Sequence, residues 1–330
     1  MRAAVIEAVN QVRVKDIPKP ECGPGKVLIK VAYGGFCGPT EMCIIEGLHP
    51  RAKFPLVFCH EFAGTVEEAA PGSAFKPGDR VVVNPLRFCG QCETCRAGYS
   101  YVCGDLKLIG IDCDGGFAEY CAVPEENVLH IPENLPFKMA AIVEPVAVGV
   151  HAVRGTGVGV GDSVLVFGAG PIGIILAEVC RTAGAGSVVI CETNDRRIEF
   201  AKSLGFMVEK DASALVKSGR QFDYVMDSTG AEAILPHAID LVKIRGKIAI
   251  VGKFDFPAKV NLHDVLFKEI TMQGFRVYTE REFAFTIGML AANAERFERI
   301  ITDDYCLDDA AQAVEDFRQR RNLCKIVIHP

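Results

Sequence analysis

The segment from Ser163 to Phe275 constrains the fold of this chain more than any other. Short apolar runs alternate there with helical patterns, as in parallel sheets whose strands are buried on both faces. The alternation therefore predicts an α/β fold with a doubly wound parallel sheet. The expected strands are 163–167, 187–192, 222–227, 246–251 and 269–275, and the expected helices are 172–183 and 195–204.

A glycine-rich turn joins the first of these strands to the first helix. Residues 164–173 read VLVFGAGPIG, so Gly168, Gly170 and Gly173 form G-x-G-x-x-G between a strand and a helix. In that context the first glycine permits the tight turn, the second lets a pyrophosphate approach, and the third allows close helix–strand packing. Because the helix N-terminus also favours phosphate groups, the motif predicts a dinucleotide site. Glycines that serve only a sharp turn are the alternative.

Glu192 ends the second strand, nineteen residues after Gly173. Its carboxylate would accept hydrogen bonds from both hydroxyls of an adenosine ribose and would repel a 2′-phosphate. This predicts NAD rather than NADP as the cofactor. Arg196 and Arg197 follow on the next helix and could serve a phosphate, although a solvated helix face is the simpler interpretation. Arg197 is kept among the candidate cofactor residues.

Four cysteines lie within fifteen residues of a polar, glycine-containing segment. Their spacing is C-x2-C-x2-C-x7-C, formed by Cys89, Cys92, Cys95 and Cys103. Free thiols would follow a periodic apolar face, disulfides across two-residue gaps are strained, and the bacterial ferredoxin run ends in C-x3-C-P. Four thiolates around Zn²⁺ form a closed tetrahedral site that orders an irregular loop. The spacing therefore predicts a structural zinc.

Composition limits the classes of protein that remain. With 330 residues the chain has room for two domains, and a net charge of −6 gives no electrostatic support for nucleic-acid binding. The longest apolar runs are interrupted by glutamate, glycine or proline and do not approach a membrane span. The start of the chain has no signal-peptide pattern, so the 14 cysteines are expected to be reduced thiols and metal ligands in a cytoplasmic protein.

The first 140 residues are rich in glycine and proline and carry short alternating segments. This pattern predicts a β-rich, partly barrel-like domain. The expected strands are 1–18 as one alternating strand, 27–33, 64–68, 79–84 and 117–123, and a helical pattern begins at Lys138. The last fifty residues predict two helices and a final strand over 324–328. We expect that strand to return to the N-terminal β region.

Four further potential ligands precede the nucleotide segment: Cys37, His60, Glu61 and Glu144. Glu144 interrupts an apolar helix, where a carboxylate is costly to bury unless it is paired or meets a metal. A catalytic zinc needs three protein ligands and an open position. Taken singly, these residues are better explained as a core thiol, a capped histidine and a helix N-terminal acid.

Taken in order, the motifs resemble the zinc-dependent medium-chain alcohol dehydrogenases, most closely the polyol (sorbitol-type) and threonine dehydrogenase branch. The matching stretches are GGFCG, HEFAGTV, FKPGDRV, the four-cysteine segment, GGFAEY, VEPVAVGVHAV, GDSVLVFGAGPIG, DSTG and GFR. The resemblance implies a GroES-like catalytic domain over 1–149 and 279–330, with a structural zinc lobe at 89–103. It also implies a Rossmann NAD-binding domain over 150–278 and a homodimer or homotetramer.

The resemblance implies a role for each candidate residue. Cys37, His60 and Glu61 would bind the catalytic zinc, which acts as a Lewis acid on an alcohol, and Glu144 would lie beside it as an additional or exchangeable ligand. Arg276 would face the cofactor or the substrate. The other cofactor residues that the resemblance implies are Pro171, Ile172, Ser228, Thr229, Val251 and Gly252.

The chain departs from the family pattern at two places. The family's C-G-[ST]-D reads Cys37-Gly38-Pro39-Thr40-Glu41. If Pro39 is an insertion, Thr40 is the proton-relay hydroxyl and Glu41 takes the acidic place; otherwise the proton must leave another way. Cys59 stands where the family usually has glycine, and its thiol could line the site or simply pack.

The implied reaction is oxidation of a secondary alcohol of a polyol, sugar or sugar acid to the ketone, with hydride transfer to NAD. L-threonine or a vicinal diol is the alternative substrate. A non-enzymatic nucleotide-binding protein or zinc-less reductase on the same fold, and a zinc-ribbon nucleic-acid binder, are the remote alternatives. The loop 46–53, which includes His49 and Arg51, is expected to line the substrate pocket.

Overall fold

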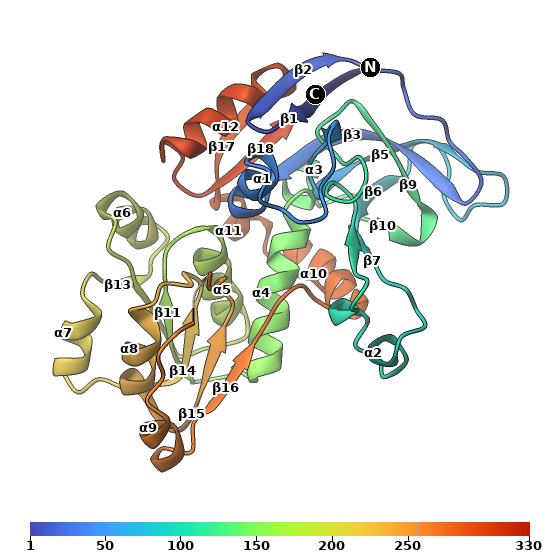
Figure 1. Cartoon of the computed structure of the whole chain (residues 1–330). Helices are drawn as coiled ribbons and strands as arrows, with labels where there is room; N and C mark the ends of the chain where they lie inside the picture. The colour runs from blue at the N-terminus through green and yellow to red at the C-terminus, as the bar shows by residue number, and fades with distance from the viewer. Residues whose placement is uncertain (256) are drawn as a thin grey trace. The chain divides into compact units, whose positions relative to one another are not determined.

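The chain folds into two compact units in a computed structural model that describes residues 1–255 and 257–330 (Figure 1). Unit 1 comprises Met1–Glu144 together with Thr279–Pro330, and unit 2 comprises Pro145–Tyr278. The C-terminal segment therefore belongs with the N-terminal part of the chain. In the described residues, no helix is long and apolar enough to cross a membrane.

Unit 1 is built on a seven-stranded sheet ordered β10-β6-β5-β3-β18-β17, with β9 also paired to β3. The long strand β3 is antiparallel to β5, β9 and β18. Its alternate apolar side chains join a buried cluster that also contains Phe58, Phe62 and Phe117. The strands are β3 (Lys26–Phe36), β5 (Glu61–Ala69), β6 (Arg80–Val83), β9 (Tyr120–Pro124), β10 (Val128–His130), β17 (Ile301–Cys306) and β18 (Lys325–His329).

The final strand returns to the N-terminal β region as predicted, because β18 pairs with the end of β3. The prediction of two helices before it was wrong. The segment contains α10 (Glu280–Ala292), α11 (Ala294–Glu298), the strand β17 and α12 (Ala310–Arg318). The sequence of β17, ITDDYC, carries two adjacent acids that break an apolar alternation, and β17 forms as an edge strand parallel to β18.

The N-terminal stretch is a hairpin rather than the single strand that its alternation predicted. Strands β1 (Arg2–Ala8) and β2 (Gln11–Asp16) pair antiparallel, and Asn10 makes the turn with φ 59°. Asparagine tolerates this left-handed conformation, which tight hairpin turns require. The remaining elements of unit 1 are β4 (Leu56–Val57), β7 (Leu86–Arg87), β8 (Lys107–Leu108), α1 (Gly38–Ile45), α2 (Glu93–Arg96) and α3 (Phe137–Ala140).

Unit 2 is a parallel six-stranded sheet ordered β13-β12-β11-β14-β15-β16. The strands β11 (Ser163–Phe167) and β14 (Phe222–Asp227) have the predicted bounds, and the doubly wound α/β class is confirmed. The other strands are β12 (Ser187–Cys191), β13 (Met207–Glu209), β15 (Val242–Ile250) and β16 (Thr271–Gly274). The helices are α4 (Val143–Thr156), α5 (Pro171–Thr182), α6 (Asp195–Ser203), α7 (Ala212–Lys217), α8 (Ile234–Leu241) and α9 (Leu262–Phe267).

Positive φ angles explain most of the boundary errors in unit 2. Strand β15 starts earlier than predicted and passes through Arg245, where φ is 60° and the register against β14 shifts. Strand β16 is shorter than predicted because Glu269, with φ 49°, cannot continue an extended strand. The helical pattern from Lys138 divides at Ala141–Ile142 into α3 and α4.

The strand order reverses beside β11, which lies between β12 and β14. In open parallel sheets of this kind, ligands bind outside the carboxyl ends of the strands at the point of reversal. This point is where the glycine-rich turn follows β11.

Candidate active site and metal centres

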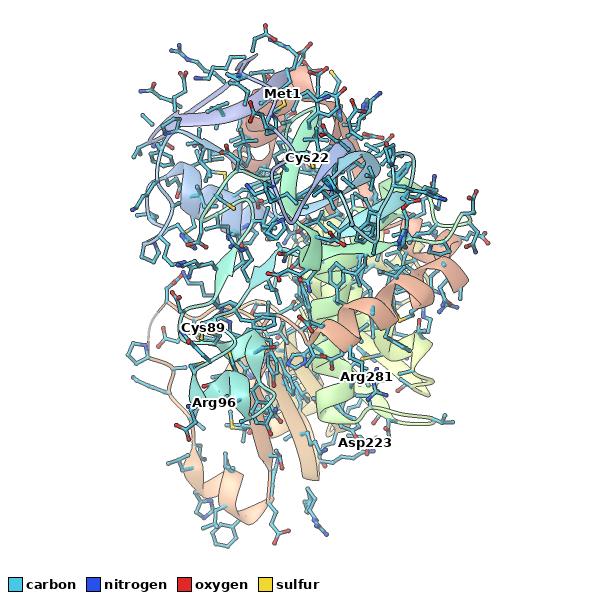
Figure 2. The ribbon with its side chains drawn as sticks, turned by 90° about the vertical axis from the view of Figure 1, so that its right-hand side faces the viewer. Met1, Cys22, Cys89, Arg96, Asp223 and Arg281 are labelled. Atoms are coloured by element: carbon cyan, nitrogen blue, oxygen red, sulfur yellow. The ribbon has the colours of Figure 1, made fainter. Side chains whose placement is uncertain are left out.

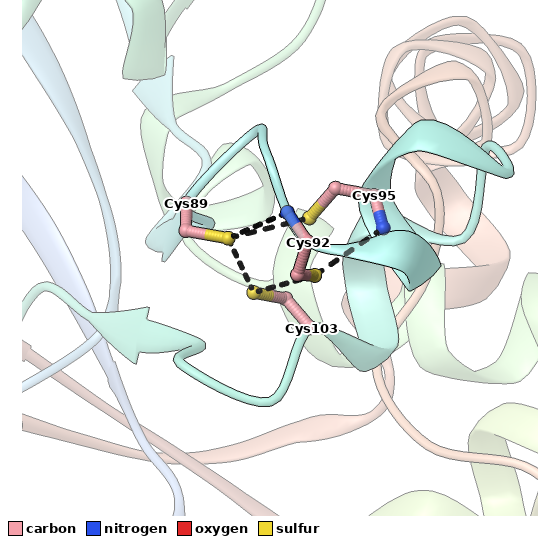
Figure 3. A group of neighbouring side chains, drawn as sticks. All are labelled: Cys89, Cys92, Cys95 and Cys103. Carbon is pink, nitrogen blue, oxygen red and sulfur yellow. Dashed lines mark hydrogen bonds between the residues drawn. The ribbon is translucent and has the colours of Figure 1, made fainter.

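Four cysteine side chains converge between β7 and β8 (Figure 3). Cys89 Sγ lies 4.0 Å from Cys95 Sγ and 3.5 Å from Cys103 Sγ, and Cys92 Sγ lies 3.9 Å from Cys103 Sγ. A tetrahedron of sulfurs with Zn–S bonds of about 2.3 Å has edges of about 3.8 Å. The separations also exclude disulfides, whose sulfurs lie about 2.05 Å apart. The four residues fit a closed zinc site.

Backbone N–H groups support these sulfurs. Cys92 N–H donates to Cys89 Sγ and Cys95 N–H donates to Cys92 Sγ, both at 3.4 Å. The Cys95 N–H lowers the pKa of Cys92 to about 6, which favours the thiolate that metals bind. These N–H donors lie at the start of α2, whose N-cap is Cys92. Cys89 and Arg96, at the two ends of the stretch that contains these donors, are labelled in Figure 2. A local loop thus supplies both the ligands and their support.

A second group of potential ligands brings together Cys37, His60 and Glu61. One ligand atom of each lies within 4.8 Å of the others. Cys37 directly follows β3 and Glu61 begins β5, and these neighbouring strands pair Gly35 with Glu61. His60 and Glu61 are 4% and 1% exposed. One sulfur, one nitrogen and one oxygen donor leave a fourth tetrahedral position open, as in catalytic zinc sites.

Glu41 supports the histidine of this group. Its Oε1 lies 3.2 Å from His60 Nδ1, and its carboxylate is fully buried. Burial lowers the pKa of His60, but the Glu41 carboxylate and the Cys37 sulfur raise it well above its usual range. Because Nδ1 faces Glu41, Nε2 is the nitrogen that remains for a metal. Metal-binding histidines are commonly held by a carboxylate in this way.

Buried polar atoms without hydrogen-bond partners indicate whether the group of Cys37, His60 and Glu61 fits a metal. The 3.2 Å contact between Glu41 and His60 is close enough for an ion pair but lacks hydrogen-bond geometry. Within the described residues, the buried Glu41 oxygens and His60 Nδ1 therefore have no hydrogen-bond partner. Buried polar groups normally have such partners, and unpaired ones are costly. A cation at the open position would compensate the buried negative charge around it. The residues therefore fit a catalytic zinc.

Lys325 pairs with Glu61 and was missed by the sequence reasoning. Its Nζ lies 2.7 Å from Glu61 Oε1 and 3.0 Å from the Phe36 carbonyl oxygen, and it is 2% exposed. Burial lowers the pKa of Lys325, but Glu61 raises it above its ordinary value. A lysine in the apolar run CKIVIH was the available signal, because lysine is rarely buried unpaired. Nothing in the sequence indicated that the partner of Lys325 is Glu61, which lies 264 residues away.

Gly35 makes room for the Glu61 carboxylate. A Cβ added at Gly35 would lie 2.1 Å from Glu61 Oε2, a distance that real Cβ atoms do not adopt. Glycine is needed here for close approach rather than for backbone conformation. The GGFCG motif therefore positions both Cys37 and Glu61.

Thr40 lies in the first turn of α1, and its Oγ1 is 3.2 Å from Cys37 Sγ. Pro39 also lies in this first turn, where proline costs no helical hydrogen bond. The arrangement places a hydroxyl beside the group of potential ligands. Glu144, in the first turn of α4, is buried but is not part of the three-residue group.

The loop 46–53 is fixed by an ion pair. Arg51 Nε and Nη2 donate to the two carboxylate oxygens of Asp112 at 2.8 and 3.1 Å. Asp112 also accepts the Leu108 N–H at 2.8 Å. The Arg51 guanidinium is therefore engaged with another loop, and the lining of the substrate pocket by the loop 46–53 stays a prediction.

The glycine-rich turn in unit 2 has the geometry that its motif predicts. Gly168 has φ 95°, and a Cβ at Gly173 would lie 2.0 Å from the Gly168 oxygen. Gly170 is the N-cap of α5, and an added Cβ would lie 3.8 Å from Arg197 Nη1, an ordinary contact distance. Among the residues that the structure describes, no side chain caps α5, so its first N–H groups are available to an anion. Pro171, Ile172 and Gly173 form its first turn.

Glu192 lies beside this turn and is 9% exposed. One carboxylate oxygen accepts the Ala169 N–H at 2.9 Å, and the other accepts the N–H groups of Thr193 and Asn194 at 2.7 and 2.8 Å. The Thr193 hydroxyl also lies 3.5 Å from this second oxygen. Each carboxylate oxygen has two acceptor positions, so the oxygen that accepts the Ala169 N–H is the one with a position left for a ribose hydroxyl. The Arg197 N–H is capped by the Asn194 side chain, and its guanidinium lies near Gly170.

Two further loops meet at the same edge of the sheet. Ser228 Oγ donates to the Phe167 carbonyl at 2.7 Å and would contact a Cβ on Gly168. The N–H groups of Val251 and Gly252 both donate to the Asp227 carbonyl at 2.9 Å. Thr229 Oγ1 bonds to the Asp227 carboxylate. Arg276 follows β16 at this edge and is exposed.

Comparisons with known proteins identify the family of this chain. Residues 23–133 match the alcohol dehydrogenase GroES-like domain, and residues 171–292 match the zinc-binding dehydrogenase domain. The chain belongs to the zinc-dependent medium-chain alcohol dehydrogenases, in the polyol and threonine dehydrogenase branch. It combines a GroES-like domain with a Rossmann-type domain.

Two curated relatives illustrate the similarity, one over the full chain and the other over about two thirds of it. Sorbitol dehydrogenase of Bacillus subtilis strain 168 is 31% identical over 100% of this chain and 97% of its own length. D-altritol 5-dehydrogenase of Agrobacterium fabrum is 37% identical over 68% of this chain and 69% of its own length. The likeness to named dehydrogenases shows that the chain is a zinc alcohol dehydrogenase.

Solved structures of similar proteins carry nicotinamide cofactors of both kinds. A zinc-binding dehydrogenase of Sinorhizobium meliloti 1021 bound to NADP superposes with a TM-score of 0.92 at 28% identity, covering 100% of this chain and 99% of that one. An Escherichia coli CFT073 alcohol dehydrogenase complexed with NADH gives a TM-score of 0.93 at 28% identity with the same coverage. The fold alone therefore does not decide between the two cofactors.

Proposed function

We propose that this chain oxidises a secondary alcohol of a polyol, sugar or sugar acid to the ketone and transfers the hydride to NAD. The observation that carries the proposal is the group of half-buried Cys37 with buried His60 and Glu61, in which Glu41 contacts the histidine. A four-sulfur site alone would support only a structural role. The second group has the open position that chemistry needs.

The chain's own residues prepare an alcohol for hydride loss. Cys37, His60 and Glu61 would hold a zinc ion, which would supply a Lewis acid for the alcohol. Glu41 orients His60 so that Nε2 is presented, and Lys325 fixes the carboxylate of Glu61. Thr40, whose hydroxyl lies next to the Cys37 sulfur, would accept the alcohol proton as it releases its own proton to solvent, since the residue is only half-buried.

The donor set favours an oxygen-rich substrate. A carboxylate in place of a second thiolate gives a harder set of ligands, which suits oxygen donors. Glu144 adds a further buried carboxylate in the same unit. A polyol or sugar acid can offer neighbouring oxygens to a metal. The relatives of this chain that are named sorbitol dehydrogenase and D-altritol 5-dehydrogenase support this substrate class. A simple primary alcohol would leave such polar groups unpaired.

Glu192 supports NAD as the cofactor. Its buried carboxylate beside the Ala169 N–H would lie next to the adenosine ribose of a dinucleotide seated on α5, where a 2′-phosphate would bring like charges together. Replacing Glu192 with alanine should weaken NAD use and permit NADP, with Arg197 close enough to pair with the phosphate. Equal kcat/KM for both cofactors in the wild type would contradict the preference.

A screen of NADH production tests the substrate class. The panel comprises polyols, aldonates, L-threonine, short vicinal diols and ethanol, measured with the zinc-loaded wild type and with Cys37→Ser as the blank. We expect the highest kcat/KM on a polyol, sugar or aldonate and little activity on ethanol. Ethanol or a long-chain primary alcohol at the top of the panel would overturn the proposal.

L-threonine and vicinal diols form the second candidate class, since the branch includes threonine dehydrogenases. They share the secondary alcohol next to a second polar group. The same screen separates them, because a threonine or butanediol optimum with weak polyol turnover would select this class.

A further inference from the structure

Cys59 has an unusual backbone conformation immediately before the proposed ligands His60 and Glu61. Its φ is 90°, in the left-handed region that side-chain-bearing residues rarely adopt. The residue is completely buried, between β4 and β5. Strain of this kind persists only where the surroundings impose it, and it clusters at functional sites.

A neighbouring loop imposes this conformation. The Cys59 carbonyl accepts the Gly116 N–H at 2.9 Å. A Cβ at Gly115 would lie 2.0 Å from that carbonyl oxygen, and a Cβ at Gly110 would lie 2.2 Å from it. The loop therefore packs directly on the Cys59 peptide and leaves it no room to rotate.

The thiol of Cys59 points back at the two strands that carry the ligands. Its Sγ lies 3.2 Å from the Glu61 carbonyl oxygen on β5 and 3.5 Å from the Gly35 carbonyl oxygen on β3. Gly35 and Glu61 face each other in the pairing of these strands. A thiol is a hydrogen-bond donor, so one S–H can be shared between the two carbonyls. Glycine at position 59 would relieve the strain but could not make these contacts.

We propose that Cys59 is a positioning residue for the metal centre formed by Cys37, His60 and Glu61. Its S–H holds the start of β5 against the end of β3, and so fixes the turn from which His60 and Glu61 reach the metal. The alternative is that the thiol only fills space. The inference rests on the proposed metal centre, and the experiment below distinguishes the failure of one from the failure of the other.

Three substitutions separate the thiol from the backbone strain. Cys59→Ala keeps the strain and loses the donor, Cys59→Gly loses both, and Cys59→Ser keeps a donor. Cys121→Ala is the matched control, because Cys121 is also buried in unit 1 and lies outside both metal groups. Zinc affinity is measured by chelator competition, with a separate dissociation constant for each of the two zinc ions per chain. Thermal unfolding of each variant checks that the fold is intact.

We expect the dissociation constant of the weaker zinc equivalent to rise about 10-fold in the alanine and glycine variants, the size typical of outer-shell substitutions. The serine and Cys121→Ala variants should stay within about 3-fold of wild type, below that outer-shell effect, and the tighter equivalent should not change. Alanine and glycine variants that match wild type, or a serine variant as weak as alanine, would overturn the positioning role. A wild type that binds only one zinc would overturn the proposed metal centre, and this inference with it.

Discussion

The four-cysteine group and the group of Cys37, His60 and Glu61 differ in how the chain assembles them. The first comes from fifteen consecutive residues and is supported by backbone N–H groups of the same loop. The second joins the ends of two strands and is supported by the side chains of Glu41 and Lys325. Four sulfurs would close the coordination sphere of a metal in the first group, whereas three donors would leave a position open in the second.

The difference shows what each site requires of the fold. A local loop with four thiolates obtains its order from the metal, so its integrity depends on all four ligands. The second group is ordered by the β3–β5 pairing and by a buried ion pair, so we expect the fold not to depend on a metal there. The group of Cys37, His60 and Glu61 can therefore take part in catalysis without lowering the stability of the fold.

Replacing one ligand of the four-cysteine group should have the largest effect on the fold. Cys92→Ala leaves three thiols and an irregular loop, and structural zinc sites supply much of the folding energy of such segments. We expect poor folding or aggregation, with the yield of folded protein reduced at least about 10-fold. Cys22→Ala, a cysteine outside both groups, is the control. A stable and fully active Cys92→Ala protein would refute the structural assignment.

His60→Ala should abolish turnover while leaving the fold intact. Loss of a Lewis acid is worth several kcal/mol, so kcat/KM should fall at least about 1,000-fold. The thermal midpoint and the binding of NAD should stay close to wild type, since the nucleotide segment is in unit 2. His263→Ala, an exposed histidine, should retain full activity. Activity within a few-fold of wild type in His60→Ala would contradict the catalytic assignment.

Lys325→Met tests the buried ion pair of the second group. Removing one partner leaves the Glu61 charge uncompensated, which typically costs about 3–5 kcal/mol in the free energy of unfolding. The cost should be smaller in the zinc-loaded protein, because a cation then compensates Glu61. Lys15→Met breaks a partly exposed pair with Glu7 and should cost about 1 kcal/mol or less. Equal losses in the two variants during urea unfolding would contradict the account.

Thr40→Val removes the proposed relay hydroxyl with little change in shape. General acid–base groups typically contribute 10²–10⁴-fold, so kcat should fall about 100-fold at neutral pH with KM nearly constant. Thr40→Ser should restore most of the rate. A valine variant with wild-type kcat would show that the proton leaves by another route.

The sequence predicted the elements whose signals are local. The bounds of β11 and β14 follow from continuous apolar runs, and the four-cysteine spacing is readable within one loop. Strand β17 was missed because its acids hide the alternation, and the N-terminal hairpin was missed because Asn10 gives a weak turn signal.

The site was predictable only as far as family motifs reach. Cys37, His60 and Glu61 stand in recognisable stretches, and the structure brings them together. The pairing of Lys325 with Glu61 and the Arg51–Asp112 ion pair depend on contacts across 264 and 61 residues. Local sequence patterns carry no signal for such distances. Cys59 was visible as a departure from glycine, but its positive φ was not.

Stepwise removal of zinc tests the central claim most directly, which is that one metal serves structure and the other serves chemistry. The wild-type protein is treated with increasing chelator while zinc content, dehydrogenase activity and the thermal midpoint are followed together. The account predicts two zinc per chain. Activity should disappear with the first equivalent lost and return on adding zinc, and the midpoint should collapse only with the second. A protein that holds a single zinc, or that loses activity and fold in the same step, would contradict it.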